Sequence, residues 1–158
     1  MPKFTVRNLN RFLAIKLPSA FISGIRVSAI SDKEAIANVT HRWINQNPFG
    51  SLYWATQGMA AELVTGILLM KKIKESGQKI SMLVVKQEGS FHKKATGKIA
   101  FSCHQGAEID QIISAAIETG EGQHLVLKAT GFNQEHVMVS DFEFSWSIKL
   151  KSSIDEHN

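Results

Sequence analysis

A long apolar segment in the first half of the chain constrains the fold more than any other feature. It follows the turn Asn47-Pro48-Phe49-Gly50, runs to Met70 and ends at the basic stretch Lys71-Lys72-Ile73-Lys74. Lysines favour the end of a helix, where free carbonyl groups carry partial negative charge. Glu62 is the only charged residue between positions 49 and 70. A helix that is apolar on nearly every face needs cover on nearly every face, so the rest of the chain must wrap around it.

Alternation of apolar and polar residues predicts strands on both sides of this helix. We expect these strands near 25–29, 35–39, 99–103, 125–129 and 138–150. A nearly continuous apolar run at 80–86 predicts a further, buried strand. Periodic apolar residues predict two more helices, at 6–17, ended by Pro18, and at 107–119. This order predicts an α+β fold in which a mainly antiparallel sheet curls around one long central helix.

Length and composition are those of an ordinary globular domain. We expect one domain over 1–151, with 1–20 as an N-terminal helical extension and 152–158 as a flexible tail. With 44% hydrophobic and 20% charged residues and no signal peptide, the chain is expected to be cytoplasmic. The single cysteine, Cys103, excludes a disulfide framework, and the histidines lack metal-ligand spacing, so we predict no metal site.

The charge balance favours anionic ligands, including phosphorylated ones. Net charge is +4 and the pI is near 9.3, but the basic residues are scattered, so we predict no nucleic-acid binding. Residues 51–70 could span a bilayer by length, yet Glu62 and two glycines at mid-depth oppose a membrane span. The short apolar stripe of the first helix predicts packing on the domain, with a membrane-surface helix as the alternative.

The residues around the start of the central helix resemble the hotdog-fold acyl-CoA thioesterases. In the phenylacetate-pathway type, an Asn precedes a Gly, a His-Gly-Gly opens the helix, and an Asp or Glu follows nine residues after the His. Here Asn47 and Gly50 stand at the first two places, Tyr53-Trp54-Ala55 replaces His-Gly-Gly, and Glu62 takes the place of the carboxylate. The chain is also similar to a functionally unassigned branch with an Asn-Pro-x-Gly-x-x-Tyr opening. The order of elements agrees over nearly the whole chain after residue 20.

The resemblance implies a hotdog fold, a coenzyme A thioester as substrate and no cofactor. In the family, N–H groups at the helix start polarise the thioester carbonyl, which implies that role for Tyr53, Trp54 or Ala55. The nine-residue separation of Tyr53 and Glu62 is about half a turn out of phase at roughly 100° per residue, so the two point to opposite sides of one helix. Family members place their sites between subunits, which implies a homodimer or a homotetramer here.

The predicted site residues follow from these roles. As catalytic residues we expect Glu62 as general base or nucleophile, Asn47 to orient water or the carbonyl, and Trp54. As substrate-binding residues we expect Tyr53, Ala55, Gln57, Gly50, His92, Lys93 and Lys94. The last three lie at a turn where family members often contact the phosphates of coenzyme A.

Structural roles remain open for the same residues. Glu62 can be a buried carboxylate paired with a neighbour, Asn47 a turn residue, and Gln57 an interface hydrogen-bonding group. Tyr53 and Trp54 can belong to the core, and 92–94 can be a solvated basic turn.

The function that we expect from this resemblance is hydrolysis of an acyl-CoA thioester at a dimer interface. The alternative is a non-catalytic protein that holds an acyl group or acyl-CoA in the same groove, because bulky residues replace His-Gly-Gly. A dehydratase or hydratase fits less well, since those enzymes usually add a catalytic His and the central segment has none.

Overall fold

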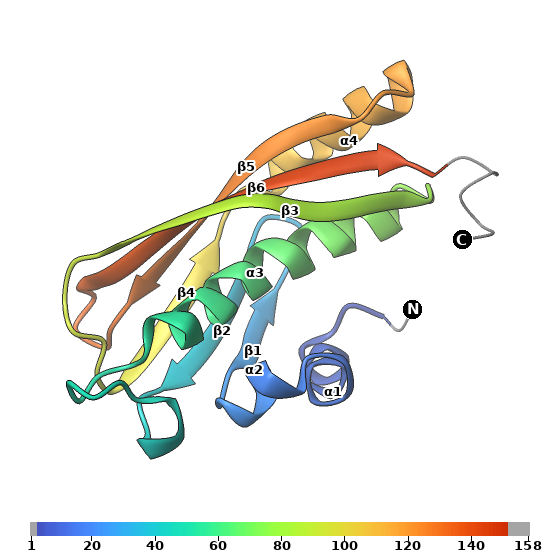
Figure 1. Cartoon of the computed structure of the whole chain (residues 1–158). Coiled ribbons are helices and arrows are strands. Elements are labelled where there is room, and N and C mark those ends of the chain that lie inside the picture. Colours follow the sequence, from blue (N-terminus) through green and yellow to red (C-terminus); the bar gives the residue numbers. More distant parts are fainter. Residues whose placement is uncertain (1–2, 152–158) are drawn as a thin grey trace.

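The computed structural model describes residues 3–151, which form a curved sheet and the helices that cover it (Figure 1). The helices are α1 (Val6–Lys16), α2 (Pro18–Ile22), the 3-10 helix η1 (Trp43–Asn45), α3 (Trp54–Glu75) and α4 (Gly106–Thr119). The strands are β1 (Arg26–Ile30), β2 (Ala35–Thr40), β3 (Ile80–Phe91), β4 (Lys98–Cys103), β5 (Gln123–Phe132) and β6 (Met138–Leu150).

The six strands form one antiparallel sheet in the order β1-β2-β4-β5-β6-β3. The sheet bends around α3, which packs against β2, β4, β5 and β6 (Figure 1). This is the wrapped central helix expected from the apolar segment, and it is the hotdog arrangement. The elements expected at 25–29, 35–39, 99–103, 107–119, 125–129 and 138–150 are all present, within a few residues of their expected limits.

Alternation along the strands supplies the core. On β6, Phe142, Phe144, Trp146 and Ile148 are buried toward α3, while the residues between them stay at least partly exposed. Val64, Ile67 and other apolar residues of α3 meet this layer. Two ion pairs between a buried lysine and an exposed aspartate hold the C-terminal half of α3: Lys71 with Asp32, and Lys72 with Asp110 at 2.8 Å. Lysines of the basic stretch after Met70 therefore bind carboxylates of the same chain.

The expectation of a buried strand at 80–86 is wrong. β3 lies at the edge of the sheet and pairs only with β6 within the described residues. Leu83 is 65% exposed, and Val85 and Phe91 are exposed as well. A continuous apolar run is typical of burial on both faces, but here the outward apolar residues face solvent in the single chain.

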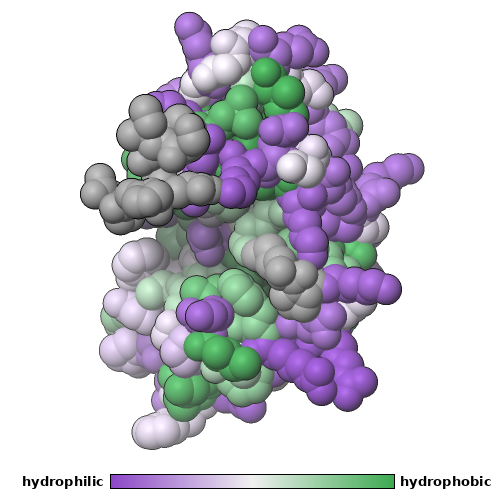
Figure 2. Space-filling model, turned by 90° about the vertical axis from the view of Figure 1, so that its right-hand side faces the viewer, coloured by the Kyte–Doolittle hydropathy of each residue, from purple (hydrophilic) through white to green (hydrophobic). Residues whose placement is uncertain are grey.

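The N-terminal region also differs from expectation. Pro18 ends α1, as expected, but it also begins a second short helix, because proline fits the first helical position where no N–H is needed. α1 and α2 lie at the lower end of the molecule in Figure 1. Figure 2, which faces the side where α1 lies, shows hydrophobic residues gathered in the lower part of that side.

No helix within residues 3–151 is long and apolar enough to cross a membrane. The tail predicted at 152–158 lies outside the described residues.

Candidate active site at the start of helix α3

The loop before α3 is shaped by the side chain of Asn47. Its Oδ1 accepts hydrogen bonds from the N–H groups of Phe49 at 2.9 Å and Ser51 at 3.2 Å. Its Nδ2 donates to Ser51 Oγ at 3.0 Å. Gly50 has a φ of 74°, a left-handed conformation that glycine adopts without strain. Turn chemistry therefore uses the Asn47 amide within its own loop, and the catalytic role predicted for it stays a prediction.

This loop leaves the first turn of α3 with free hydrogen-bond donors. Tyr53 is the N-cap and its side chain does not cap the helix. The Tyr53 N–H donates to Asn45 O at 2.9 Å, so it is engaged. Within residues 3–151, the N–H groups of Trp54 and Ala55 have no acceptor. These two groups, at the positive end of the helix dipole, are free to bind an anion or a polarised carbonyl.

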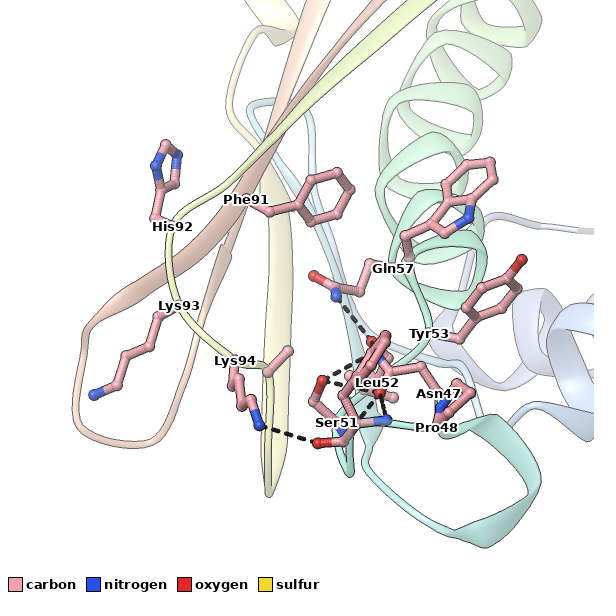
Figure 3. A pocket seen from close by; sticks show the side chains of 13 residues that line it. Asn47, Pro48, Ser51, Leu52, Tyr53, Gln57, Phe91, His92, Lys93 and Lys94 are labelled. Atoms are coloured by element: carbon pink, nitrogen blue, oxygen red, sulfur yellow. Dashed lines mark hydrogen bonds between the residues drawn. The ribbon is translucent and has the colours of Figure 1, made fainter.

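A cavity of about 480 Å³ opens over this helix start (Figure 3). Its walls come from three places in the sequence: the loop at 47–53, the first turn of α3, and residues 91–95, which begin at the last residue of β3. Tyr53 and Trp54 meet edge to face with ring centroids 5.9 Å apart and are both exposed. Apolar and aromatic walls with a few polar groups are the usual lining of a site for an organic ligand.

A buried hydrogen-bond chain fixes the wall of this cavity. Gln57 Nε2 donates to Leu52 O at 3.2 Å, and Ser140 Oγ on β6 donates to Gln57 Oε1 at 2.8 Å. Both side chains are buried, so the satisfied amide links the loop, α3 and the sheet. Gln57 therefore has a structural partner on β6, and its predicted contact with substrate stays a prediction.

The three basic residues predicted for phosphate binding lie at the rim of the cavity. Lys94 Nζ donates to Phe49 O at 3.0 Å and turns toward the loop, whereas His92 and Lys93 extend away from the aromatic side chains (Figure 3). His92 Nε2 lies 2.5 Å from an oxygen of Asp141. The positive charge is therefore at the outer edge of the cavity, not in its floor.

Glu62 lies elsewhere on α3. It does not line the cavity, and within residues 3–151 its carboxylate has neither an ion pair nor a hydrogen bond. Glu62 Oε1 and the Trp146 ring both flank Gly66, at 3.5 Å and 3.4 Å from the position that a Cβ would take there. Burial raises the pKa of the Glu62 carboxyl above its ordinary value, because this apolar setting penalises the charged form.

The structure thus brings together most of the predicted residues and separates one. Seven of them line the cavity, namely Asn47, Tyr53, Trp54, Gln57, His92, Lys93 and Lys94. Gly50 and Ala55 lie next to lining residues, and Glu62 is about two turns along the helix. Sequence reasoning missed Phe91 and Ser140. Phe91 lies at the far end of β3, beyond the strand expected at 80–86, and nothing in the sequence pairs Ser140 with Gln57.

Solved structures of low sequence identity share this fold over almost their full length. A protein of unknown function from Pseudomonas aeruginosa, described as a probable thioesterase, is 19% identical with a TM-score of 0.80, covering 96% of this chain and 97% of that one. A protein of unknown function from Chlorobaculum tepidum is 16% identical with a TM-score of 0.79, covering 92% and 94%. A thioesterase from Haemophilus influenzae is 16% identical with a TM-score of 0.75, covering 99% and 97%.

The sequence comparisons add a family but no activity. No match was found among curated proteins. One family model matches residues 6–148, nearly the whole described chain, and it is described as a domain of unknown function, DUF4442. The chain therefore belongs to the DUF4442 family, a functionally unassigned branch of the hotdog fold.

Proposed function

We propose that this protein hydrolyses acyl thioesters, with coenzyme A thioesters as the substrate class, at a site formed by two copies of the chain. In the proposed reaction a water molecule attacks the thioester carbonyl carbon. Glu62 of the partner subunit takes a proton from that water, the C–S bond breaks, and the thiol leaves with a proton. The products are a carboxylic acid and the free thiol.

The observation that carries the proposal is that the N–H groups of Trp54 and Ala55 are free at the start of α3, where the cavity opens. In a thioester hydrolysis the carbonyl oxygen gains negative charge in the transition state. The N–H groups of Trp54 and Ala55 point out of a helix N-terminus and need no reorganisation to receive that charge. Removing one such donor typically lowers the rate by about 100- to 1,000-fold.

The cavity suits the rest of the substrate. Aromatic and apolar side chains, Tyr53, Trp54 and Phe91, offer an apolar wall to an acyl chain. Lys93 and Lys94 at the rim offer positive charge to the phosphates of coenzyme A. The acyl group would therefore lie against the apolar wall of the cavity, and the phosphates of the coenzyme A thiol would lie at its basic rim.

Glu62 requires a second chain. Glu62 lies about two turns along α3 from the helix start and does not line the cavity, so one chain does not bring the two to one substrate. The partly exposed residues of α3 are Ala55, Gly58, Met59, Glu62, Met70 and Ile73, which places Glu62 on a helix stripe open to a partner. Two such helices running antiparallel would place each Glu62 near the start of the other helix.

A spacing in one structural neighbour agrees with this assignment. A thioesterase from Staphylococcus aureus, 14% identical to this chain, has been crystallised with a glutamine at its position 32 replaced and with a glutamate at its position 47 replaced. These positions are 15 apart, from 32 to 47, and Asn47 and Glu62 are also 15 apart, from 47 to 62. The neighbour thus carries an amide and a carboxylate at the separation that we propose for the site.

The test combines two variants that damage different halves of the site. Glu62→Gln should lower thioester hydrolysis by roughly 100- to 10,000-fold without unfolding the chain. Trp54→Pro should lower it as well, because proline removes one N–H at a helix position that tolerates proline. Trp54→Ala, which keeps the N–H, is the matched control for loss of the indole ring. Hydrolysis is followed by thiol release over a series of acyl-CoA esters.

Mixing the two inactive variants identifies the subunit arrangement. A mixed dimer of Glu62→Gln and Trp54→Pro chains contains one site with both native halves, so activity should return on mixing if the halves come from different chains. Activity that never returns would contradict the shared site, and full activity in Glu62→Gln would contradict the assigned mechanism.

The second candidate is a binding protein without turnover. It is favoured by the two large aromatic side chains, Tyr53 and Trp54, beside the free N–H groups, where they restrict the approach of a carbonyl. Wild-type protein that binds acyl-CoA by calorimetry but releases no thiol with any ester would select this function.

A further inference from the structure

One edge of the molecule carries an unusual combination of charge and exposed apolar side chains. We define the cationic edge by six exposed residues of α1, α2 and the start of η1: Arg11, Ile15, Lys16, Ile22, Arg42 and Trp43. Trp43 is 83% exposed, Ile15 74% and Ile22 61%. Large apolar side chains with this exposure are costly in water unless something covers them.

These elements are joined into one continuous surface. α1 packs on α2. The turn after α2 is tied to η1, because Asn45 Nδ2 donates to Ser23 O at 2.9 Å. The Arg42 guanidinium lies against Gly24, so close that a Cβ there would be 2.2 Å from it. Figure 1 shows α1 and α2 together at the lower end of the molecule, away from α4.

The charge of this edge has a single sign. Residues 3–31 contain five basic residues and no Asp or Glu, and residues 35–61 contain Arg42 and again no acid. Within the described chain, no carboxylate pairs with Arg11, Lys16 or Arg42. The acidic residues that balance the overall charge therefore lie elsewhere, and the cationic edge complements an anionic partner.

The form of the surface favours a lipid bilayer over a folded protein. Its apolar side chains come from a helix, a short helix and a 3-10 turn rather than from one flat strip. A cavity of about 290 Å³ on α1 is lined by Asn8, Arg11, Phe12, Ile15 and Lys16, which places two cations and an amide beside apolar carbon. Such a lining complements a lipid, whose anionic phosphate headgroup lies above an apolar acyl chain. Exposed Trp and a basic amphipathic helix are both typical of membrane interfaces.

We propose that the cationic edge docks the protein on the surface of an anionic lipid bilayer, with Trp43, Ile15 and Ile22 entering the headgroup region and Arg11, Lys16 and Arg42 contacting lipid phosphates. This binding does not depend on the proposed hydrolysis. It places an enzyme or carrier of acyl groups at the membrane, where long acyl chains partition.

The test measures co-sedimentation of the whole chain with phosphatidylcholine vesicles, with and without phosphatidylglycerol. Wild-type protein should bind the anionic vesicles, and added salt should weaken binding. Neutralising Arg11 and Lys16 to Gln should weaken it about fivefold for each cation. Trp43→Ser should weaken it by roughly tenfold, because the indole no longer enters the interface.

Fluorescence identifies the inserted residue. Anionic vesicles should shift the tryptophan emission of the wild type to shorter wavelength, and Trp43→Phe should remove most of the shift while keeping most of the binding. The matched control is Ile117→Ser with Lys149→Gln, which removes an exposed apolar residue and a cation from α4 and β6. This control should bind as the wild type does.

Four outcomes overturn the proposal. Wild-type protein that binds anionic vesicles no better than neutral ones overturns it, as does equal loss of binding in the control variant. A change of oligomeric state in Trp43→Ser, measured by light scattering, would identify the edge as a contact between copies. A chain that ignores both vesicles but binds polyglutamate would point to an acidic protein instead of lipid.

Discussion

Glu62 is a carboxylate in an apolar setting, and within residues 3–151 of the single chain no partner compensates for the loss of water around its charge. Its carboxylate lies beside Gly66 and the Trp146 ring, and among the described residues nothing pairs with it. An apolar setting raises the pKa of a carboxyl because water no longer stabilises the charge. A group in this state is poised to take a proton, which is the property that a general base requires.

The raised pKa of Glu62 predicts a pH-dependent effect on stability. The folded chain holds the Glu62 proton more tightly than the unfolded chain, so folding is favoured when the carboxyl is protonated. Stability is lost as pH rises from the ordinary pKa of Glu through the raised one. Glu62→Gln should therefore raise the melting temperature at neutral pH, and the difference should shrink in acid. Thermal unfolding of both proteins across this pH range checks it, and a variant less stable at neutral pH would contradict it.

Residue roles were only partly predictable from the sequence. The charge pattern singled out Glu62 because one carboxylate stands in a long apolar helix, and its lack of a partner fits that interpretation. The sequence left both a catalytic and a turn role open for Asn47, and in the structure its side-chain amide makes hydrogen bonds within its own loop. The Gln57–Ser140 hydrogen bond joins residues 83 positions apart, and such a long-range pair leaves no local signal.

At the scale of elements, local periodicity predicted most helices and strands, but it failed where burial depends on the position of an element in the fold. β3 has the apolar run of a buried strand, but its place at the sheet edge leaves Leu83 and Val85 exposed. Strand order is set by long-range pairing, which periodicity does not contain. The start of α4 depends on a close approach that only the structure shows, since a Cβ on Gly106 would be 2.0 Å from Asp32 O.

Two glycine-to-alanine substitutions should have opposite effects. Gly106→Ala forces a methyl group against the backbone of the β1–β2 turn, so it should destabilise the fold by about 1–3 kcal/mol. Gly58→Ala adds the same methyl inside α3, where the nearest neighbour atom, on Phe142, is 3.7 Å away, so it should stabilise by up to about 1 kcal/mol. Urea unfolding measures both, and a stable Gly106→Ala protein would show that the turn can yield.

At the scale of the whole molecule, three partly open surfaces have different characters. Exposed Leu83, Val85 and Phe91 on the edge strand β3 offer apolar surface, and the open stripe of α3 carries Glu62 among apolar residues. Phe91 and the start of α3 line the candidate site, so both surfaces suit a second copy of the same chain. The cationic edge is basic and lies at the lower end of the molecule, so it suits an anionic lipid surface. A dimer built on β3 and α3 leaves α1 and η1 open, and membrane docking and catalysis are therefore compatible in one assembly.

The apolar edge of β3 predicts how the assembly can be broken. An exposed strand of 12 residues with outward Leu83 and Val85 is a surface on which another strand can pair, and lysine on an edge strand opposes such pairing. Leu83→Lys with Val85→Lys should give a folded monomer, because both side chains already face solvent in the single chain. Since the proposed site needs Glu62 from a partner, the monomer should also lose thioester hydrolysis. Light scattering and circular dichroism measure assembly and fold, and a monomer that keeps the wild-type rate would contradict the shared site.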